Sequence, residues 1–299
     1  MSYPTQGPVR LRVNLADYPV TMALKEGRVS SPLVSFDFCG PKTAHDGFKA
    51  MVRDDAYDAG ELAIVTYLQA RTYGKPYVLL PAPILGRLQH HCIGYSAKYG
   101  ALAPKDIEGK RVGVRTYAQT TGLWVRGILK HDFGVDLDQV IWCTLDEAHL
   151  SEHVDPANCE RLPPGSKLDK LMLEGALDAA ILGDLMPADP DVCRLIPNHT
   201  AAAQDWLART QVLPMNHIFT VHEDLARERP DVVAELFRLI VESRKLAPTA
   251  ALTTIPPFGV EANRKGLELA IDWSLEQKII PRRMSVDDLF CDATRYLTA

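Results

Sequence analysis

Two histidines and a glutamate in this chain have the properties needed for acid–base chemistry. His91 follows Arg87 by four residues, and His217 ends the tetrapeptide Pro-Met-Asn-His. His90, next to His91, is expected to be only an exposed neighbour. An imidazole titrates near neutral pH, so either histidine can donate or accept a proton. Glu61 lies where an expected strand turns into a helix, a frequent position for a ligand-facing group. We expect His91, His217 and Glu61 to be catalytic; the alternatives are hinge histidines bonded to backbone and a carboxylate that favours a helix N-terminus.

A second group of residues has the types expected of an anion pocket. Arg87 and Arg115 carry fixed positive charges, and arginine grips a carboxylate through two parallel hydrogen bonds. A helix is expected to begin at Thr120, and a helix start leaves about four backbone N–H groups unpaired and a partial positive charge. Thr120 and Thr121 could bind a carboxylate there or simply cap the helix. Together with Arg264, these residues are the expected substrate-binding set.

Other residues are weaker candidates. His149 and His153 are four residues apart, which on a helix would place both on one face for a divalent metal. Without a third placed ligand, a solvated polar segment is the better interpretation, and we expect no metal. Arg126 is expected to face away from the pocket because it lies six residues beyond the helix start. Cys92 adjoins His91, but neighbouring residues of a strand point to opposite faces, so a Cys–His dyad is not expected.

The elements that would position these residues alternate along the chain. Apolar periodicity predicts strands at residues 11–15, 33–38, 57–62, 77–81, 111–114, 140–144, 177–182, 193–196 and 218–221. It predicts helices at residues 21–27, 43–54, 64–73, 120–133, 167–174, 234–245 and 263–277, with a final short helix from Val286. Strands that alternate with helices favour a parallel sheet covered on both faces, so the expected fold class is α/β.

The alternation restarts in the second third of the chain, which favours two α/β halves with the second inserted into the first. Lobe I would comprise residues 1–95 and 218–299, and lobe II residues 96–217. Two crossings, near residues 90–100 and 214–222, would form a hinge. Ligands of such folds bind at the carboxyl ends of strands, so we expect a ligand cleft between the lobes.

Composition limits the partners of this 299-residue chain. Its net charge is −5 and its basic residues do not cluster, so a nucleic-acid partner is not expected. No apolar run approaches the roughly 20 residues of a membrane helix. The N-terminus lacks a basic region followed by an apolar one, and the six cysteines include no C-x-x-C pair, so we expect a cytoplasmic protein with reduced thiols. We also expect a homo-oligomer and, without a glycine-rich phosphate loop, no cofactor.

Short pieces distributed along nearly the whole chain carry a family resemblance. They are Ala16-Asp17-Tyr18, Gly60-Glu61-Leu62, Arg87 with His91, Gly109 to Val114, Tyr117, Trp124 to Gly127, Phe133 to Val135, Pro214 to His217, Phe258-Gly259 and Asn263-Arg264. In their order and spacing they resemble the 4,5-dihydroxyphthalate decarboxylase family, which is itself similar to type II periplasmic binding proteins. The chain departs from the family pattern at Gln89-His90 and at Arg115-Thr116, beside the expected pocket.

The resemblance implies a two-lobed, type II periplasmic-binding-protein-like α/β fold in which each lobe is a mixed sheet flanked by helices. It implies a carbon–carbon lyase of phthalate degradation, which removes CO2 from a hydroxylated aromatic acid without oxidation. It also adds Tyr117 to the substrate-binding residues. The alternatives are a binding protein for a small anion and a decarboxylase of another aromatic or heteroaromatic acid.

This chemistry makes definite demands on a site. Direct loss of CO2 from an aryl carboxylate would leave an unstable ring carbanion. A ring hydroxyl ortho or para to that carbon avoids it, because its deprotonation pushes electrons into the ring, the carbon is protonated, and CO2 leaves as the ring regains aromaticity. The site therefore needs an acid near the ring carbon, a base near the phenol, and cations for a second carboxylate.

Overall fold

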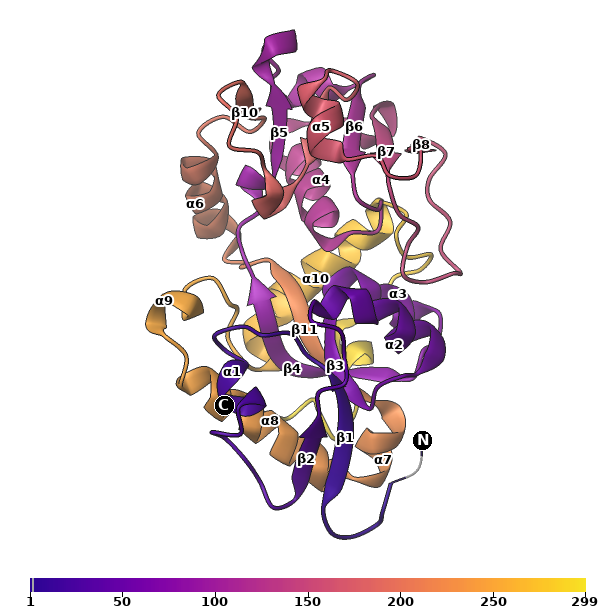
Figure 1. Ribbon diagram of the computed structural model, residues 1–299, viewed down its shortest axis with the longest axis vertical. Coiled ribbons are helices and arrows are strands. Elements are labelled where there is room, and N and C mark those ends of the chain that lie inside the picture. Colours follow the sequence, from indigo (N-terminus) through magenta and orange to yellow (C-terminus); the bar gives the residue numbers. More distant parts are fainter. Residues whose placement is uncertain (2) are drawn as a thin grey trace.

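Two mixed β-sheets organise the chain. The structure is a computed structural model that describes residue 1 and residues 3–299. In Figure 1 the two sheets lie one above the other, and α10 (Val260–Glu276) lies between them. Among the described residues, no helix combines the length and the apolar character required to cross a membrane.

The first sheet has five strands in the order β2-β1-β3-β11-β4. They are β1 (Val9–Asn14), β2 (Val34–Asp37), β3 (Ala59–Ala63), β4 (Tyr77–Gly86) and β11 (Met215–His222). β1 pairs in parallel with β2 and β3, whereas β11 is antiparallel to both β3 and β4. A strand from late in the chain therefore enters the middle of a sheet otherwise built from its beginning.

The second sheet has six strands in the order β10-β5-β9-β6-β7-β8. They are β5 (Ile93–Ser96), β6 (Arg111–Val114), β7 (Ile141–Thr144), β8 (Cys159–Arg161), β9 (Ala179–Ile181) and β10 (Val192–Arg194). β6 is parallel to β7 and β9, and β5 is antiparallel to β9 and β10. All six strands come from residues 93–194. The expected lobe limits stay a prediction, because the sheet to which a strand belongs does not assign the helices to a lobe.

Helices flank both sheets. Besides α10, the α-helices are α1 (Met22–Lys25), α2 (Phe48–Asp54), α3 (Ile64–Thr72), α4 (Thr120–Phe133), α5 (Leu168–Leu173), α6 (His199–Thr210), α7 (Glu223–Glu228), α8 (Pro230–Lys245) and α9 (Thr249–Leu252). α4 has its predicted bounds because Gln119 before it is extended and Gly134 after it takes a left-handed conformation, φ 66°. α6 is missing from the sequence-based prediction because only Ala203 and Trp206 of this helix are buried, too few for a visible apolar stripe.

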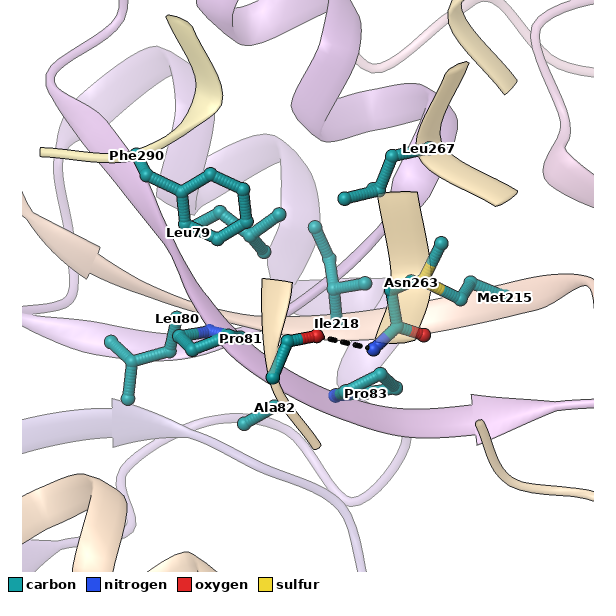
Figure 2. Close-up of a pocket in the computed structure, with 11 residues that line it drawn as sticks. Leu79, Leu80, Pro81, Ala82, Pro83, Met215, Ile218, Asn263, Leu267 and Phe290 are labelled. Atoms are coloured by element: carbon teal, nitrogen blue, oxygen red, sulfur yellow. Dashed lines mark hydrogen bonds between the residues drawn. The ribbon is translucent and has the colours of Figure 1, made fainter. Parts of the chain in front are cut away.

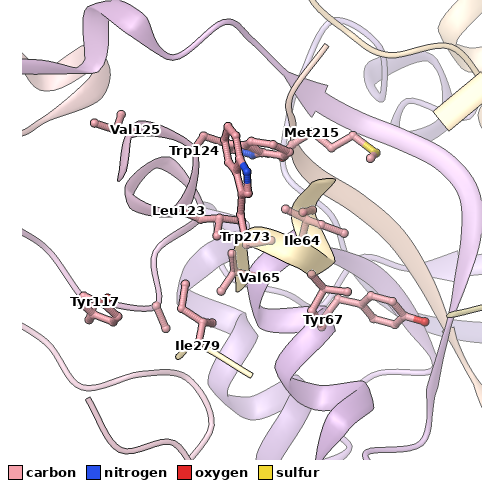
Figure 3. Packing of buried hydrophobic residues seen from close by; sticks show 14 of the residues in the cluster. Ile64, Val65, Tyr67, Tyr117, Leu123, Trp124, Val125, Met215, Trp273 and Ile279 are labelled. Carbon is pink, nitrogen blue, oxygen red and sulfur yellow. The ribbon is translucent and has the colours of Figure 1, made fainter. Parts of the chain in front are cut away.

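One apolar core joins the two sheets on one side of the molecule. Trp124 of α4 packs edge-on against Trp273 of α10 with ring centroids 5.6 Å apart, and Ile64 of α3 and Met215 of β11 belong to the same cluster (Figure 3). The helices approach closely at Gly127, where a Cβ atom would lie 1.9 Å from Trp273 Cε3. The expectation of two separate halves did not include this shared core, and the expected interlobe cleft stays a prediction.

Candidate active site

Glu61 and His217 form a direct pair on neighbouring strands of the first sheet. Glu61 lies on β3 and His217 on β11, and Glu61 Oε2 is 3.0 Å from His217 Nδ1. Glu61 has no exposed surface, and its other oxygen accepts the backbone N–H of Ala16 at 2.9 Å. Because a carboxylate accepts, Nδ1 donates in this contact and Nε2 is left for other chemistry. The burial of Glu61 favours a role in orienting His217 over direct contact with a substrate hydroxyl.

Other rings surround this pair. Phe48 of α2 meets His217 and His149 edge-on, with ring centroids 5.4 and 5.5 Å away. His149 Nδ1 lies 2.7 Å from Thr66 Oγ1. Burial, and then the charge of Arg115, lowers the pKa of His149 to about 3, so this imidazole is neutral at neutral pH.

His45 and Tyr18 belong to the same group of side chains. Burial, and then the charge of Arg115, lowers the pKa of His45, whose electrostatic neighbours include His217 and Glu61. Burial, and then the Glu61 carboxylate, raises the pKa of Tyr18. Sequence reasoning missed both as site residues. Tyr18 had a usable signal, since it lies in one of the family-like pieces, whereas no local pattern marked His45.

The loop before α4 holds buried polar groups without partners. Arg115 Nε, Thr116 Oγ1 and Gln119 Oε1 have no hydrogen-bond partner in the described part of the chain. Thr120 Oγ1 accepts the N–H of Val65 at 3.3 Å, so this predicted anion ligand already has a partner in α3. Buried polar groups are nearly always paired, so the two that can donate, Arg115 Nε and Thr116 Oγ1, suit a bound anion beside the helix start, whereas Gln119 Oε1 can only accept.

Arg87 lies just past β4 and contacts residues from both halves of the chain. It pairs with Asp184, and its Nη2 lies 3.4 Å from Thr121 Oγ1 at the start of α4. His91 Nε2 is 3.6 Å from the same Asp184 carboxylate. Burial, and then the charge of Arg87, lowers the pKa of His91, so its neutral form predominates at neutral pH. Arg87 and His91 thus meet around a carboxylate that no sequence pattern marked, and Thr121 contacts the same guanidinium.

The neighbours of His91 differ from expectation. Residues His90–Cys92 form a 3₁₀ turn rather than part of a strand, so Cys92 Sγ approaches His91 Nε2 to 3.6 Å. Burial raises the pKa of Cys92 to about 11, so it remains a thiol and supplies no thiolate nucleophile at neutral pH. The prediction that His90 is exposed is wrong: it is 1% exposed and packs beside Trp206.

Two predicted substrate-binding residues lie in other surroundings. Arg264 pairs with Glu261 at 2.6 Å and with Asp287 at 3.1 Å, so nearby carboxylates already neutralise it. Tyr117 is 3% exposed, and the Arg126 guanidinium lies 4.0 Å from its ring centroid. These contacts support structural roles, and the substrate-binding roles of both residues stay predictions.

The spacing of His149 and His153 has no helix to support it. Residues 146–153 are irregular; His149 contacts Thr66, and His153 Nε2 lies 3.3 Å from Asp155. Nowhere in residues 1 and 3–299 do three histidine, cysteine, aspartate or glutamate side chains gather in a metal-binding arrangement.

A separate pocket lies beside the first sheet, between β4, β11 and α10 (Figure 2). Its lining is mostly apolar and includes Leu79, Ile218 and Phe290. Its polar side chain, Asn263, donates to the carbonyl of Gly259 at 2.8 Å. Because no acid–base candidate lines this pocket, the candidate active site is the group around Glu61 and His217.

Comparison with known proteins supports the family resemblance. The chain is 26% identical over 226 residues to 4,5-dihydroxyphthalate decarboxylase of Comamonas testosteroni, a match that covers 68% of this chain and 66% of that protein. It is 28% identical over 211 residues to the protein of the same name from Pseudomonas putida, with 66% of this chain and 81% of that protein covered. The chain is thus similar in sequence to two proteins named 4,5-dihydroxyphthalate decarboxylase. No family model matches it.

Solved structures confirm the predicted fold of this chain. The sulphonate-binding protein SsuA of Escherichia coli has a TM-score of 0.62 at 14% identity, with 98% of this chain and 95% of that chain covered. SsuA of Xanthomonas axonopodis, bound to MOPS, has a TM-score of 0.58 at 13% identity, with 96% and 99% covered. The desulfurization enzyme DSZB has a TM-score of 0.51 at 14% identity, with 94% and 96% covered. The predicted periplasmic-binding-protein-like α/β fold is confirmed, and since it serves binding proteins and an enzyme, the fold does not decide between them.

Proposed function

We propose that this protein is a carbon–carbon lyase that decarboxylates a hydroxylated aromatic acid of the 4,5-dihydroxyphthalate type, without oxidation. The observation that carries the proposal is the Glu61–His217 pair, in a chain related to decarboxylases of that name. A fully buried carboxylate bonded to a partly exposed imidazole fixes the orientation of the ring and holds a hydrogen on its Nδ1. A protonated imidazole with a free Nε2–H is the acid that the reaction needs.

In the proposed reaction, His217 donates a proton to the ring carbon that bears the carboxylate. His45, which burial and Arg115 keep neutral, accepts the phenolic proton. The bond to CO2 then breaks, and its electron pair restores the aromatic ring as a phenolate. The phenolate recovers its proton from His45, and solvent reprotonates His217, so each CO2 released consumes one proton.

The positive charge of Arg115 supports the binding of an acidic substrate at this site. Its Nε and the hydroxyl of Thr116 are buried donors without a protein partner in the described chain, and both precede the start of α4. A carboxylate would satisfy these donors and the unpaired N–H groups of the helix start together. We propose that this group holds one carboxylate while His217 faces the ring.

A small-anion binding protein is the second candidate, and the likeness to the two SsuA structures favours it. The same unmet donors would serve a binding protein equally well. A binding protein does not require a buried carboxylate that orients an imidazole, so the Glu61–His217 pair supports the lyase.

Turnover tests the proposal directly. Purified protein is given 4,5-dihydroxyphthalate, and the released CO2 and the product protocatechuate are measured over time. We expect stoichiometric formation of both without added cofactor. Saturable binding without turnover would instead support the binding protein, and turnover of other ring acids alone would support a decarboxylase of a different acid. The cytoplasmic location and the homo-oligomer stay part of the proposal.

A further inference from the structure

Asp184 occupies a position that the proposed reaction leaves unexplained. It pairs with Arg87, and its carboxylate lies 3.6 Å from His91 Nε2. Its side chain is nevertheless 74% exposed, whereas those of Arg87 and His91 are only 25% and 33% exposed. An exposed, solvated carboxylate therefore neutralises a half-buried guanidinium beside the start of α4.

The contact joins the two sheets. Arg87 follows β4 of the first sheet, and Asp184 lies in the turn after β9 of the second. Gly183 has φ +59°, and a Cβ atom there would lie 2.9 Å from Arg87 Nη2. The turn thus leaves room for the guanidinium, whose Nη2 also reaches Thr121 Oγ1.

The two arginines near α4 differ in their partners. Arg115 keeps a buried Nε without a partner in the described chain, whereas the guanidinium of Arg87 is matched by Asp184. A substrate with one carboxylate can bind at Arg115 and leave Asp184 in place. A second carboxylate that binds Arg87 in place of Asp184 must first break this ion pair, whose guanidinium is half-buried.

We propose that Asp184 is a specificity-determining residue whose carboxylate occupies the subsite for the second carboxylate of an aromatic dicarboxylate. The inference rests on the proposed function, since it assigns the substrate class of that same site. Binding exchanges one carboxylate for another on Arg87, so Asp184 lowers the affinity for dicarboxylates by competition and by repulsion between like charges.

Calorimetric titration with phthalate and with benzoate, which lack the ring hydroxyl, tests the proposal in the wild-type protein and in Asp184→Asn. We expect the variant to bind phthalate about tenfold more tightly, with benzoate changed less than about threefold. Asp205→Asn, which removes the same charge from exposed α6, should leave both affinities unchanged. In turnover, Asp184→Asn should lower KM for 4,5-dihydroxyphthalate and leave kcat unchanged.

The outcomes separate this inference from the proposed function. An equal gain in affinity for phthalate and for benzoate overturns the role of Asp184. So does a variant that neither binds phthalate more tightly nor has a lower KM. Wild-type turnover of 4,5-dihydroxyphthalate in that same experiment would leave the decarboxylase intact. Absence of turnover together with absence of phthalate binding would overturn both. If Asp184 is only a structural link between the sheets, Asp184→Asn should lower Tm and leave both affinities unchanged.

Discussion

At the scale of single residues, the histidines of this chain are divided by their surroundings. His217 meets a buried carboxylate, whereas His149, His45 and His91 lie near arginines and in buried settings that lower their pKa values. The second setting favours a neutral imidazole, which can accept a proton, whereas the carboxylate beside His217 orients that ring.

The replacement His217→Ala tests which histidine is the acid. We expect kcat to fall by about 10²-fold or more, because the proton donor is removed, whereas His91→Ala should lower it less than about tenfold. His131→Ala is the matched control, since that ring stacks on Trp273 and pairs with exposed Glu276. Steady-state release of CO2 is the measurement. A larger loss for His91→Ala would transfer the acid role to that residue.

Glu61→Gln tests the orienting role of the carboxylate. The amide keeps an oxygen for the N–H of Ala16 but places an NH2 donor where Oε2 accepted the Nδ1–H of His217. We expect kcat to fall by roughly 10–10²-fold with KM nearly unchanged, since the substrate does not touch this residue. A rise in KM at constant kcat would show that Glu61 binds substrate instead.

At the scale of elements, a buried arginine ties α4 to α10. Arg126 is fully buried; its Nε donates to Gln277 Oε1 at 2.8 Å, and one Nη donates to the carbonyl of Tyr117 at 2.7 Å. The guanidinium also stacks on the Tyr117 ring. Burial lowers the pKa of this arginine, yet it stays charged at neutral pH because its ordinary value is so high.

Arg126→Ala should therefore be strongly destabilising. We expect the free energy of unfolding to fall by about 3–5 kcal/mol, because the change opens a cavity and strips partners from Gln277 and the Tyr117 carbonyl. Arg264→Ala, on the surface of α10, should cost less than about 1 kcal/mol, since exposed ion pairs contribute little. The measurement is urea unfolding of both variants. Similar losses of unfolding free energy would contradict the role of Arg126 in holding α4 to α10.

The elements differ in how far the sequence predicts them. α8 is visible because its buried residues repeat at helical spacing after Pro230, and α4 is visible because Gly134 marks its end. α6 is not predicted from the sequence, because most of its residues are exposed and no apolar stripe is visible. His149 and His153 have helical spacing by chance, because residues 146–153 are irregular.

At the scale of the whole molecule, the site depends on a strand register that no local pattern encodes. Glu61 and His217 are 156 positions apart and meet only because β11 runs antiparallel to β3. The sequence named both residues from their types and their places near strand ends, but not their contact. Asp184 and His45 escaped notice because neither lies in a motif, and their importance arises from tertiary neighbours.

Buried histidines should make the whole fold sensitive to acid. Burial lowers the pKa of His90 to about 4 and that of His149 to about 3, whereas both approach about 6.5 in the unfolded chain. Above that value both states are neutral. As pH falls below it, the unfolded chain binds protons that the folded chain refuses, so stability drops until the folded pKa values are reached.

The urea midpoint should therefore fall between pH 7 and pH 5, with each of these histidines contributing about 1–2 kcal/mol. His90→Leu removes one titrating group from beside Trp206 and should flatten the dependence. The measurement is urea unfolding of the wild type and the variant at several pH values. An unchanged slope would mean that the pKa of His90 is the same in the folded and the unfolded chain.

The place of β11 in the first sheet affects how the nascent chain matures. Within that sheet β4 is bonded only to β11, and about 130 residues separate the two strands. At about 5–20 residues per second, the ribosome needs roughly 6–26 seconds to deliver the missing neighbour. The second sheet lies entirely within that interval and can form first, while an apolar strand of ten residues waits without a partner. We expect newly made chains to need chaperone protection during this delay.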